Sequence, residues 1–174
     1  AYVPKRGVRL FAKQSFNHFN ETDNENFTNS EVSLEFYQTS RTLIPITLGI
    51  KGGAAHATGD VPFYELNTVG RTTGLHGYDR DRFSGNTSAY LDNQLTVEFG
   101  SVRTAVVPLT IGVFGFYDVG RVWIPDETSN TLHTGYGGGF YLKPLLDVLT
   151  TKFSIAFSEE EKSGLFEFGL GLKL

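Results

Sequence analysis

Polar and apolar side chains alternate strictly along residues 105–123, which predicts a β-strand with two different faces. One row of alternate residues carries no charge and is mostly apolar: Leu109, Ile111, Val113, Gly115, Tyr117 and Val119. The other row combines a carboxylate, two glycines and two large aromatic residues: Thr110, Gly112, Phe114, Phe116, Asp118 and Gly120. The first row suits contact with lipid, and the second suits a lumen that other parts of the protein fill.

The same alternation recurs in seven further segments, at about 6–18, 31–40, 43–58, 88–100, 131–142, 148–158 and 164–174. No charge lies in the middle of any apolar row, and these charged residues lie on the polar rows: Arg9, Lys13, Glu31, Glu35, Lys51, Asp92, Glu98, Asp118, Lys152, Glu167 and Lys173. A charge facing lipid at the bilayer midplane costs about 2–4 kcal/mol, so uncharged rows fit a membrane protein. The sequence therefore predicts an all-β fold, an antiparallel transmembrane β-barrel of eight strands that forms one outer-membrane domain over residues 1–174. A soluble sandwich or a lipocalin-like barrel remains the alternative, because it would alternate in the same way with the apolar row inside.

The connections between the predicted strands alternate in length. Residues 19–30 and 59–87 form long loops, whereas 40–42 and 101–104 form short links. Outer-membrane barrels have this arrangement, with short periplasmic turns and longer extracellular loops. We therefore expect both ends of the chain on the periplasmic side of a bacterial outer membrane.

Composition excludes several other classes of protein. The chain has 20 Gly, 15 Phe and 8 Tyr, but no Cys, so disulfide and thiolate chemistry are excluded. A net charge of −4, with scattered Lys and Arg, gives no reason to expect a nucleic-acid partner. No apolar run reaches about 18 residues, so no transmembrane helix is predicted. No signal peptide is recognisable, which leads us to expect a mature chain or a fragment if the protein is exported.

The last predicted strand has a polar residue, a glycine and two apolar residues at fixed spacing: Glu167, Gly169, Leu172 and Leu174. This pattern resembles the C-terminal sorting signal that the bacterial outer-membrane assembly machinery reads. Leu174 stands where that signal usually has an aromatic residue. An ordinary terminal strand is the alternative interpretation.

Two motifs stand out along the chain. The loop segment 74–85 supplies the first motif, in Leu75, His76, Gly77, Tyr78, Arg82 and Phe83, and the strand 105–123 supplies the second, in Phe116, Asp118 and Gly120. Both motifs resemble those of the BamA/TamA surface-antigen superfamily of outer-membrane barrels. The chain resembles the last eight strands of that superfamily's sixteen-stranded barrel. The resemblance implies a non-enzymatic anchor or accessory in outer-membrane protein assembly or translocation in a Gram-negative bacterium. It implies outer-membrane lipid as a partner, together with assembly subunits or a second copy of the chain.

In the superfamily, the long loop folds into the lumen, and an arginine of its motif contacts the strand aspartate. His76 stands at the arginine position here, and a neutral imidazole brings a hydrogen bond but no charge. We therefore expect Asp118 to be served by Arg71, Arg80 or Arg82, or by lysines of the lumen.

The size of the chain restricts where the long loop can lie. The interior of a closed eight-stranded barrel is filled by its own side chains. The loop 59–87 must then cap the barrel from outside, or the chain must be half of a larger pore.

No metal site or other cofactor is predicted, because the four histidines show no metal-ligand spacing. We also expect no catalytic residues. The alternative is a lipid-modifying enzyme at the outer rim, for which His18, His133 and Ser158 are the candidate residues. Ordinary solvation of strand ends explains the same residues.

Overall fold

The structure is a computed structural model that describes residues 6–17, 26–102, 108–125, 127, 130–144, 149–160 and 164–172. One antiparallel sheet contains eight strands, as predicted. These strands are β1 (Arg6–Asn17), β2 (Phe27–Thr39), β3 (Ile46–Gly59), β6 (Thr87–Val102), β7 (Leu109–Trp123), β8 (His133–Pro144), β9 (Leu149–Ser158) and β10 (Leu165–Leu172). The described residues contain no helix long and apolar enough to cross a bilayer.

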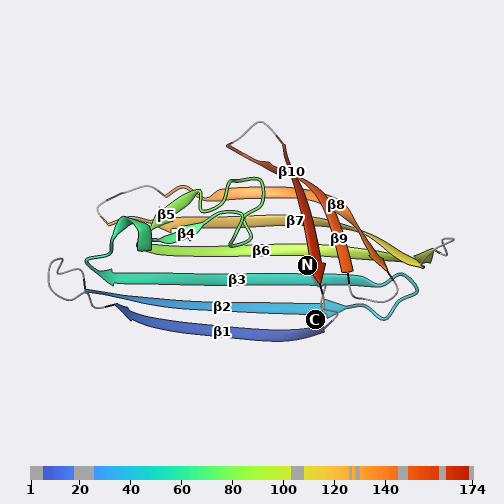
Figure 1. Ribbon diagram of the computed structural model, residues 1–174, viewed down its shortest axis with the longest axis horizontal. Coiled ribbons are helices and arrows are strands. Elements are labelled where there is room, and N and C mark those ends of the chain that lie inside the picture. Colours follow the sequence, from blue (N-terminus) through green and yellow to red (C-terminus); the bar gives the residue numbers. More distant parts are fainter. Residues whose placement is uncertain are drawn as a thin grey trace.

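Each strand of the large sheet pairs with the strands next to it in the chain, in the order β1-β2-β3-β6-β7-β8-β9-β10. The sheet curves, so that β9 and β10 run at a steep angle to β1–β3 (Figure 1). Within the described residues, β1 and β10 are not paired with each other. The expected closure into an eight-stranded barrel is therefore absent. The long loop accounts for the open sheet, because it occupies the polar face. In a closed eight-stranded barrel, the side chains of the strands would fill that space.

The two faces of the sheet differ as the alternation predicts. On β7, Val113 and Tyr117 are 39% and 51% exposed, whereas Phe116 is 6% exposed and Asp118 is completely buried. A soluble sandwich would bury the first pair and place the carboxylate in water. The structure does the opposite, so the uncharged row is the outer face, and the row with the charges is the inner face of the curve.

Several strand ends differ from the predicted ones. β2 begins at Phe27, so residues 27–30 are strand and not part of the polar loop predicted at 19–30, whose residues 19–25 lie outside the described part. β3 begins at Ile46, later than residue 43. β6 continues to Val102, with an irregular register between Glu98 and Gly100, so residues 101 and 102 of the expected link at 101–104 are strand. Hydrophobic alternation does not reveal such ends, because turn geometry and cross-strand pairing fix them.

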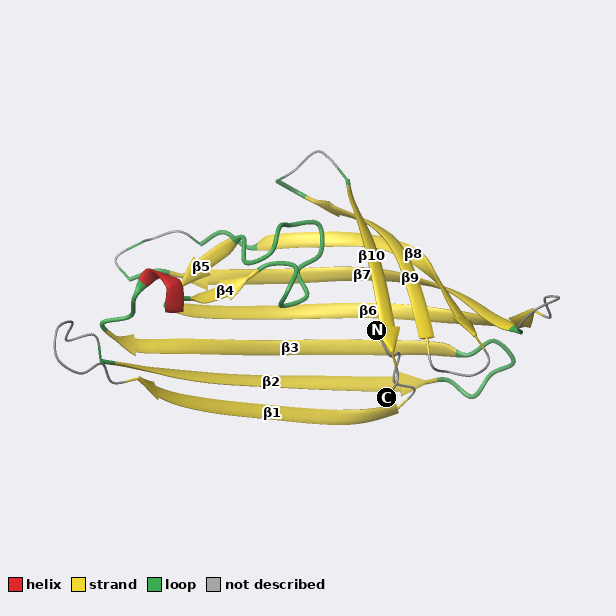
Figure 2. Ribbon diagram, viewed as in Figure 1, coloured by secondary structure: helices red, strands yellow, loops and turns green. Residues whose placement is uncertain are grey.

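The long connection between β3 and β6 has structure of its own. It contains a 3₁₀ turn, η1 (Phe63–Glu65), and a two-stranded sheet of β4 (Asn67–Val69) and β5 (Phe83–Gly85) (Figure 2). Val69, Leu75 and Tyr78 of this loop form a buried apolar cluster, against which Tyr90 of β6 and Val122 of β7 pack. The loop of residues 60–86 thus lies against the inner face of the sheet and not on its rim.

Candidate functional site

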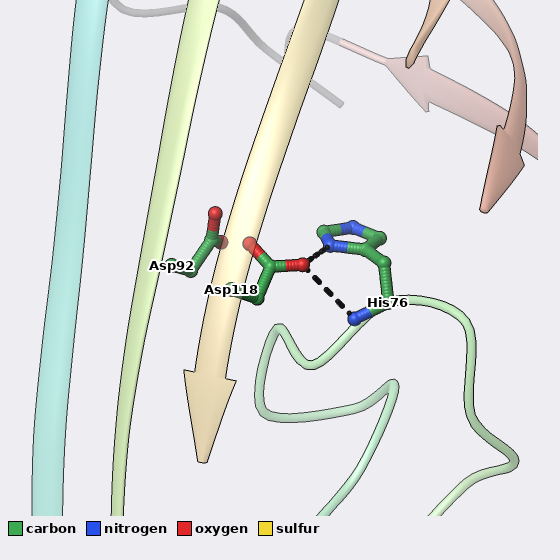
Figure 3. A group of neighbouring side chains, drawn as sticks. All are labelled: His76, Asp92 and Asp118. Atoms are coloured by element: carbon green, nitrogen blue, oxygen red, sulfur yellow. Dashed lines mark hydrogen bonds and ion pairs between the residues drawn. The ribbon is translucent and has the colours of Figure 1, made fainter. Parts of the chain in front are cut away.

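The site forms where the long loop meets the middle of β7. Asp118 points from β7 toward the loop and accepts two hydrogen bonds from His76, one from the backbone N–H at 3.1 Å and one from ring Nδ1 at 2.7 Å (Figure 3). A buried carboxylate needs such donors, because burying it without a partner costs several kcal/mol. His76 therefore provides what we expected of Arg71, Arg80 or Arg82, and that expectation is wrong for the described residues.

The surroundings of the His76 imidazole affect its pKa in opposite directions. Its burial alone would lower its pKa, but the hydrogen bond and the charge of Asp118, with smaller effects from Glu167 and Asp92, outweigh burial and raise the pKa of His76 above its ordinary value. The ring also packs on Phe116, with the ring centroids 4.3 Å apart. The loop motif and the strand motif therefore meet where the His76 imidazole hydrogen-bonds the buried carboxylate of Asp118.

A second carboxylate lies beside the first. Asp92 of β6 is the direct cross-strand partner of Asp118, and its side chain extends toward the same point (Figure 3). Ligand atoms of His76, Asp92 and Asp118 all lie within 4.8 Å of one another. The sequence does not predict this group, because the register that sets Asp92 opposite Asp118 cannot be derived from alternation alone.

Glycines create the room that the loop occupies. A methyl group at Gly135 of β8 would lie 2.0 Å from the carbonyl oxygen of His76, and one at Gly120 of β7 would lie 2.5 Å from Cγ1 of Val69. Gly77 has a φ of 83° and sits against the backbone of Phe157 in β9. The glycine of the strand motif thus permits close approach of the loop, while its aspartate holds the loop.

The remaining residues of the loop motif act in packing. Leu75 and Tyr78 are completely buried, and the hydroxyl of Tyr78 donates to the carbonyl oxygen of Thr134 at 3.1 Å. Arg82 lies over the ring of Phe83, at 5.6 Å from its centroid. These contacts fix the loop on β7 and β8.

A cavity of about 380 Å³ opens beside His76 on the inner face. Its lining includes the cations Arg71, Arg80 and Lys152, the anion Glu167, and Gln94. The inner face next to the loop therefore has a cavity lined by charged side chains, as a lumen would have.

The C-terminal motif lies only partly within the described residues. Glu167 and Gly169 are on the inner face of β10, and Nε2 of His76 approaches Glu167 to 4.0 Å. Leu172 ends β10, its side chain is not described, and Leu174 lies outside the described residues. The sorting role of this motif stays a prediction.

The residues proposed for a rim enzyme have packing partners. His133 stacks on Phe83, with the ring centroids 3.5 Å apart, and its Nδ1 hydrogen-bonds Glu160. Ser158 is buried at the end of β9, and His18 lies outside the described residues. The contacts with Phe83 and Glu160 give His133 a structural explanation, and a side-chain hydrogen bond with Tyr78 does so for Ser158.

Comparison with known proteins identifies the family. The family model described as haemolysin secretion/activation protein ShlB/FhaC/HecB matches residues 3–142, well over half of the chain. No curated protein and no solved structure matches the chain. Proteins of this family are outer-membrane β-barrels of Gram-negative bacteria that act in secretion, and not a family of enzymes. The matched residues include all of β1–β7 and both motifs of the site, and the chain belongs to the ShlB/FhaC/HecB haemolysin secretion/activation family.

Proposed function

We propose that this chain is an integral outer-membrane β-barrel segment that takes part, without enzymatic activity, in moving a protein substrate across the outer membrane. The description of the matching family, which names haemolysin secretion and activation, supports a secreted protein as the substrate. The position of the long loop on the inner face supports a role for the loop in controlling substrate passage, because a substrate that crosses the lumen would meet it.

The single observation that carries the membrane proposal is the segregation of charge between the two faces of the sheet. The exposed outer face presents large apolar residues on β6, such as Leu91, Leu95 and Phe99, at 43–62% exposure. The charged residues of the same strand, Asp92 and Glu98, lie on the other row. Water would select for polar groups at positions so exposed, whereas lipid selects against charge there.

Two adjacent substitutions on β6 test this proposal. Leu95 is half exposed on the outer face, whereas Gln94 lines the cavity on the inner face. In a membrane, Leu95→Arg should destabilise the folded barrel by about 2–4 kcal/mol, because the guanidinium faces lipid. Gln94→Arg adds the same charge toward the lumen and should cost much less.

The measurement is urea unfolding in lipid vesicles, followed by heat-modifiable migration on gels, with recovery of each variant in the outer-membrane fraction. If the outer face is bathed by water, Leu95→Arg is a surface substitution and should change stability by no more than about 0.5 kcal/mol. Equal effects of the two substitutions would therefore overturn the membrane proposal.

The BamA/TamA resemblance supports a related proposal, that the barrel assists assembly of outer-membrane proteins. The support is the contact between the loop motif at His76 and the strand motif at Asp118. Assembly subunits would then be its partners, in addition to lipid.

A second candidate function is a half-barrel that completes a larger pore. The free edges of the sheet favour it, because β1 and β10 are unpaired with each other in the described structure. In lipid, each unsatisfied backbone N–H or C=O costs several kcal/mol, so both edges require partner strands. A second copy of this chain would supply them and enclose a lumen wide enough for the loop.

A further inference from the structure

We propose that His76, Asp92 and Asp118 bind one divalent transition-metal ion, of the zinc or manganese type, on the inner face of the sheet. The ion would join three separate segments: the long loop through His76, β6 through Asp92 and β7 through Asp118. Figure 3 shows the Asp118 carboxylate between the other two side chains, with one oxygen toward Asp92 and the other toward His76, and ligand atoms of the three residues lie within 4.8 Å of one another.

The first argument is the register of the sheet. Asp92 and Asp118 face each other directly across the β6–β7 pair and lie on the same face. Like charges directly opposite in a sheet destabilise it. Two adjacent carboxylates persist in such a place when a proton or a cation lies between them.

The second argument is a fully buried oxygen that faces another carboxyl group. Asp118 is 0% exposed, and its Oδ2 takes both hydrogen bonds from His76. Its Oδ1 is buried and accepts no hydrogen bond from an N–H or hydroxyl group. Figure 3 shows this oxygen facing the Asp92 carboxyl group, where an ion would take the place of a proton shared by the two groups.

The third argument is where the nearby lysines lie. Lys51 is the cross-strand partner of Asp92 on β3, but its ammonium lies over the ring of Tyr90, at 5.4 Å from the centroid. Lys152 likewise lies over the ring of Phe114, at 5.1 Å. The described residues show no ion pair between either aspartate and a lysine or arginine. Apart from the His76 ring on Asp118, no cationic side chain of the described residues therefore lies in direct contact with the two carboxylates.

Ligand chemistry selects the kind of ion. One imidazole nitrogen and two carboxylates suit zinc and manganese, whereas calcium prefers six to eight oxygen ligands. Bonds near 2.1 Å at tetrahedral angles hold ligand atoms roughly 3.4 Å apart, so side-chain rotations must bring the three ligand atoms, which lie within 4.8 Å of one another, closer around the ion. A metal on Nδ1 displaces the proton of the Nδ1–Oδ2 hydrogen bond: a neutral ring then carries its proton on Nε2, whereas a protonated ring releases one proton to solvent.

The test is calorimetric titration of the full chain, folded in detergent and stripped with EDTA, with Zn²⁺, and separately with Ca²⁺. We expect one Zn²⁺ per chain and much weaker Ca²⁺ binding. His76→Gln, Asp92→Asn and Asp118→Asn should each weaken Zn²⁺ binding by more than about tenfold. His133→Gln is the matched control, because His133 also contacts a carboxylate, Glu160, but lies outside the metal-ligand group.

Heat-modifiable migration establishes that each variant is folded, and the absorption spectrum of bound Co²⁺ reports loss of one ligand independently of affinity. Binding of no Zn²⁺ by the parent chain would mean that a proton, not a metal, lies between Asp92 and Asp118, and would overturn the proposal. Unchanged binding by Asp92→Asn or Asp118→Asn would overturn it as well, because the ion would then lie elsewhere. Neither result depends on transport, so the proposed secretion function stands or falls separately.

Discussion

At the scale of single residues, the contact between the loop and the sheet depends on glycines, which have no side chain, as much as on the side chains that form the contact. Asp118 attracts the loop, but Gly120 and Gly135 determine how close it can come. His76 reaches Asp118 with both its backbone and its ring because no Cβ atom of β8 stands in the way.

We predict that Gly135→Ala detaches the loop from β8. The new methyl group would meet the carbonyl oxygen of His76 at 2.0 Å, and overpacking of this kind costs about 1–3 kcal/mol. Trypsin should then cleave the folded protein faster at Arg71, Arg80 or Arg82. Gly115→Ala is the control on the neighbouring strand, because its methyl group would lie 3.6 Å from the nearest atom. Equal cleavage of the two variants would show that the loop does not depend on Gly135.

The sequence placed Asp118 on the inner face correctly, because charge and alternation suffice for that. It could not identify Asp92 as the residue facing Asp118, since the β6 register depends on pairing along the whole strand. Nor could it show that His76 serves the carboxylate, because a loop of this length has no periodicity from which its path follows. The chemistry of the site therefore depends on long-range geometry, although each residue type is visible in the chain.

At the scale of elements, the long loop is a small folded unit and not an irregular connection. Asp81 has a φ of 49° and accepts hydrogen bonds from the hydroxyls of Thr72 at 2.6 Å and Thr68 at 2.9 Å. Strands as long as β6 and β7 were predictable because their alternation extends over many residues. The three-residue strands β4 and β5 were not, because so short a segment carries no measurable period.

The Asp81 contacts predict a pH response of the loop. The two threonine hydroxyls lower the pKa of Asp81 below its ordinary value of 3.8. The stabilisation is therefore fully present above pH 3.8 and is lost as the pH falls through the lower folded value. Amide hydrogen exchange of residues 68–82, corrected for intrinsic rates, should accelerate in that acid range.

Asp81→Asn provides the control for this response. Asparagine also adopts positive φ and can still accept from the threonines, but it does not titrate. Its loop should exchange with little dependence on pH, whereas Asp81→Ala should exchange faster at every pH. The same acid response in Asp81→Asn would rule out Asp81 as its source.

At the scale of the whole molecule, the sheet has two free edges in the described structure, and the proposal of a larger pore concerns what covers them. Eight antiparallel strands were predictable from eight alternating segments. Closure was not, because it depends on tilt, shear and what fills the interior. The loop on the inner face is the feature that an eight-stranded barrel has no room for.

Cysteine cross-linking should distinguish the arrangements cleanly, because the natural chain has no cysteine. Ala12→Cys on β1 is combined with Phe166→Cys, Phe168→Cys or Leu170→Cys on β10, so that one register brings the Cα atoms within about 7 Å. If two copies complete one pore, oxidation in membranes should give a covalent dimer. A monomer cross-linked within itself would instead show a closed eight-stranded barrel. Ala12→Cys with Leu95→Cys, in the middle of the sheet, should give neither product.

The loop touches the sheet at widely separated strands. The amide of Asn29 on β2 donates to Asn67 at 2.9 Å, and at the far side His76 approaches Glu167 on β10. The loop therefore connects the two sides of the curved sheet across its inner face, and these contacts restrain the curvature of the sheet. Displacing the loop would therefore open the lumen and also allow the curvature of the sheet to change. A substrate that displaces the loop would then also change the width of the pore through which it passes.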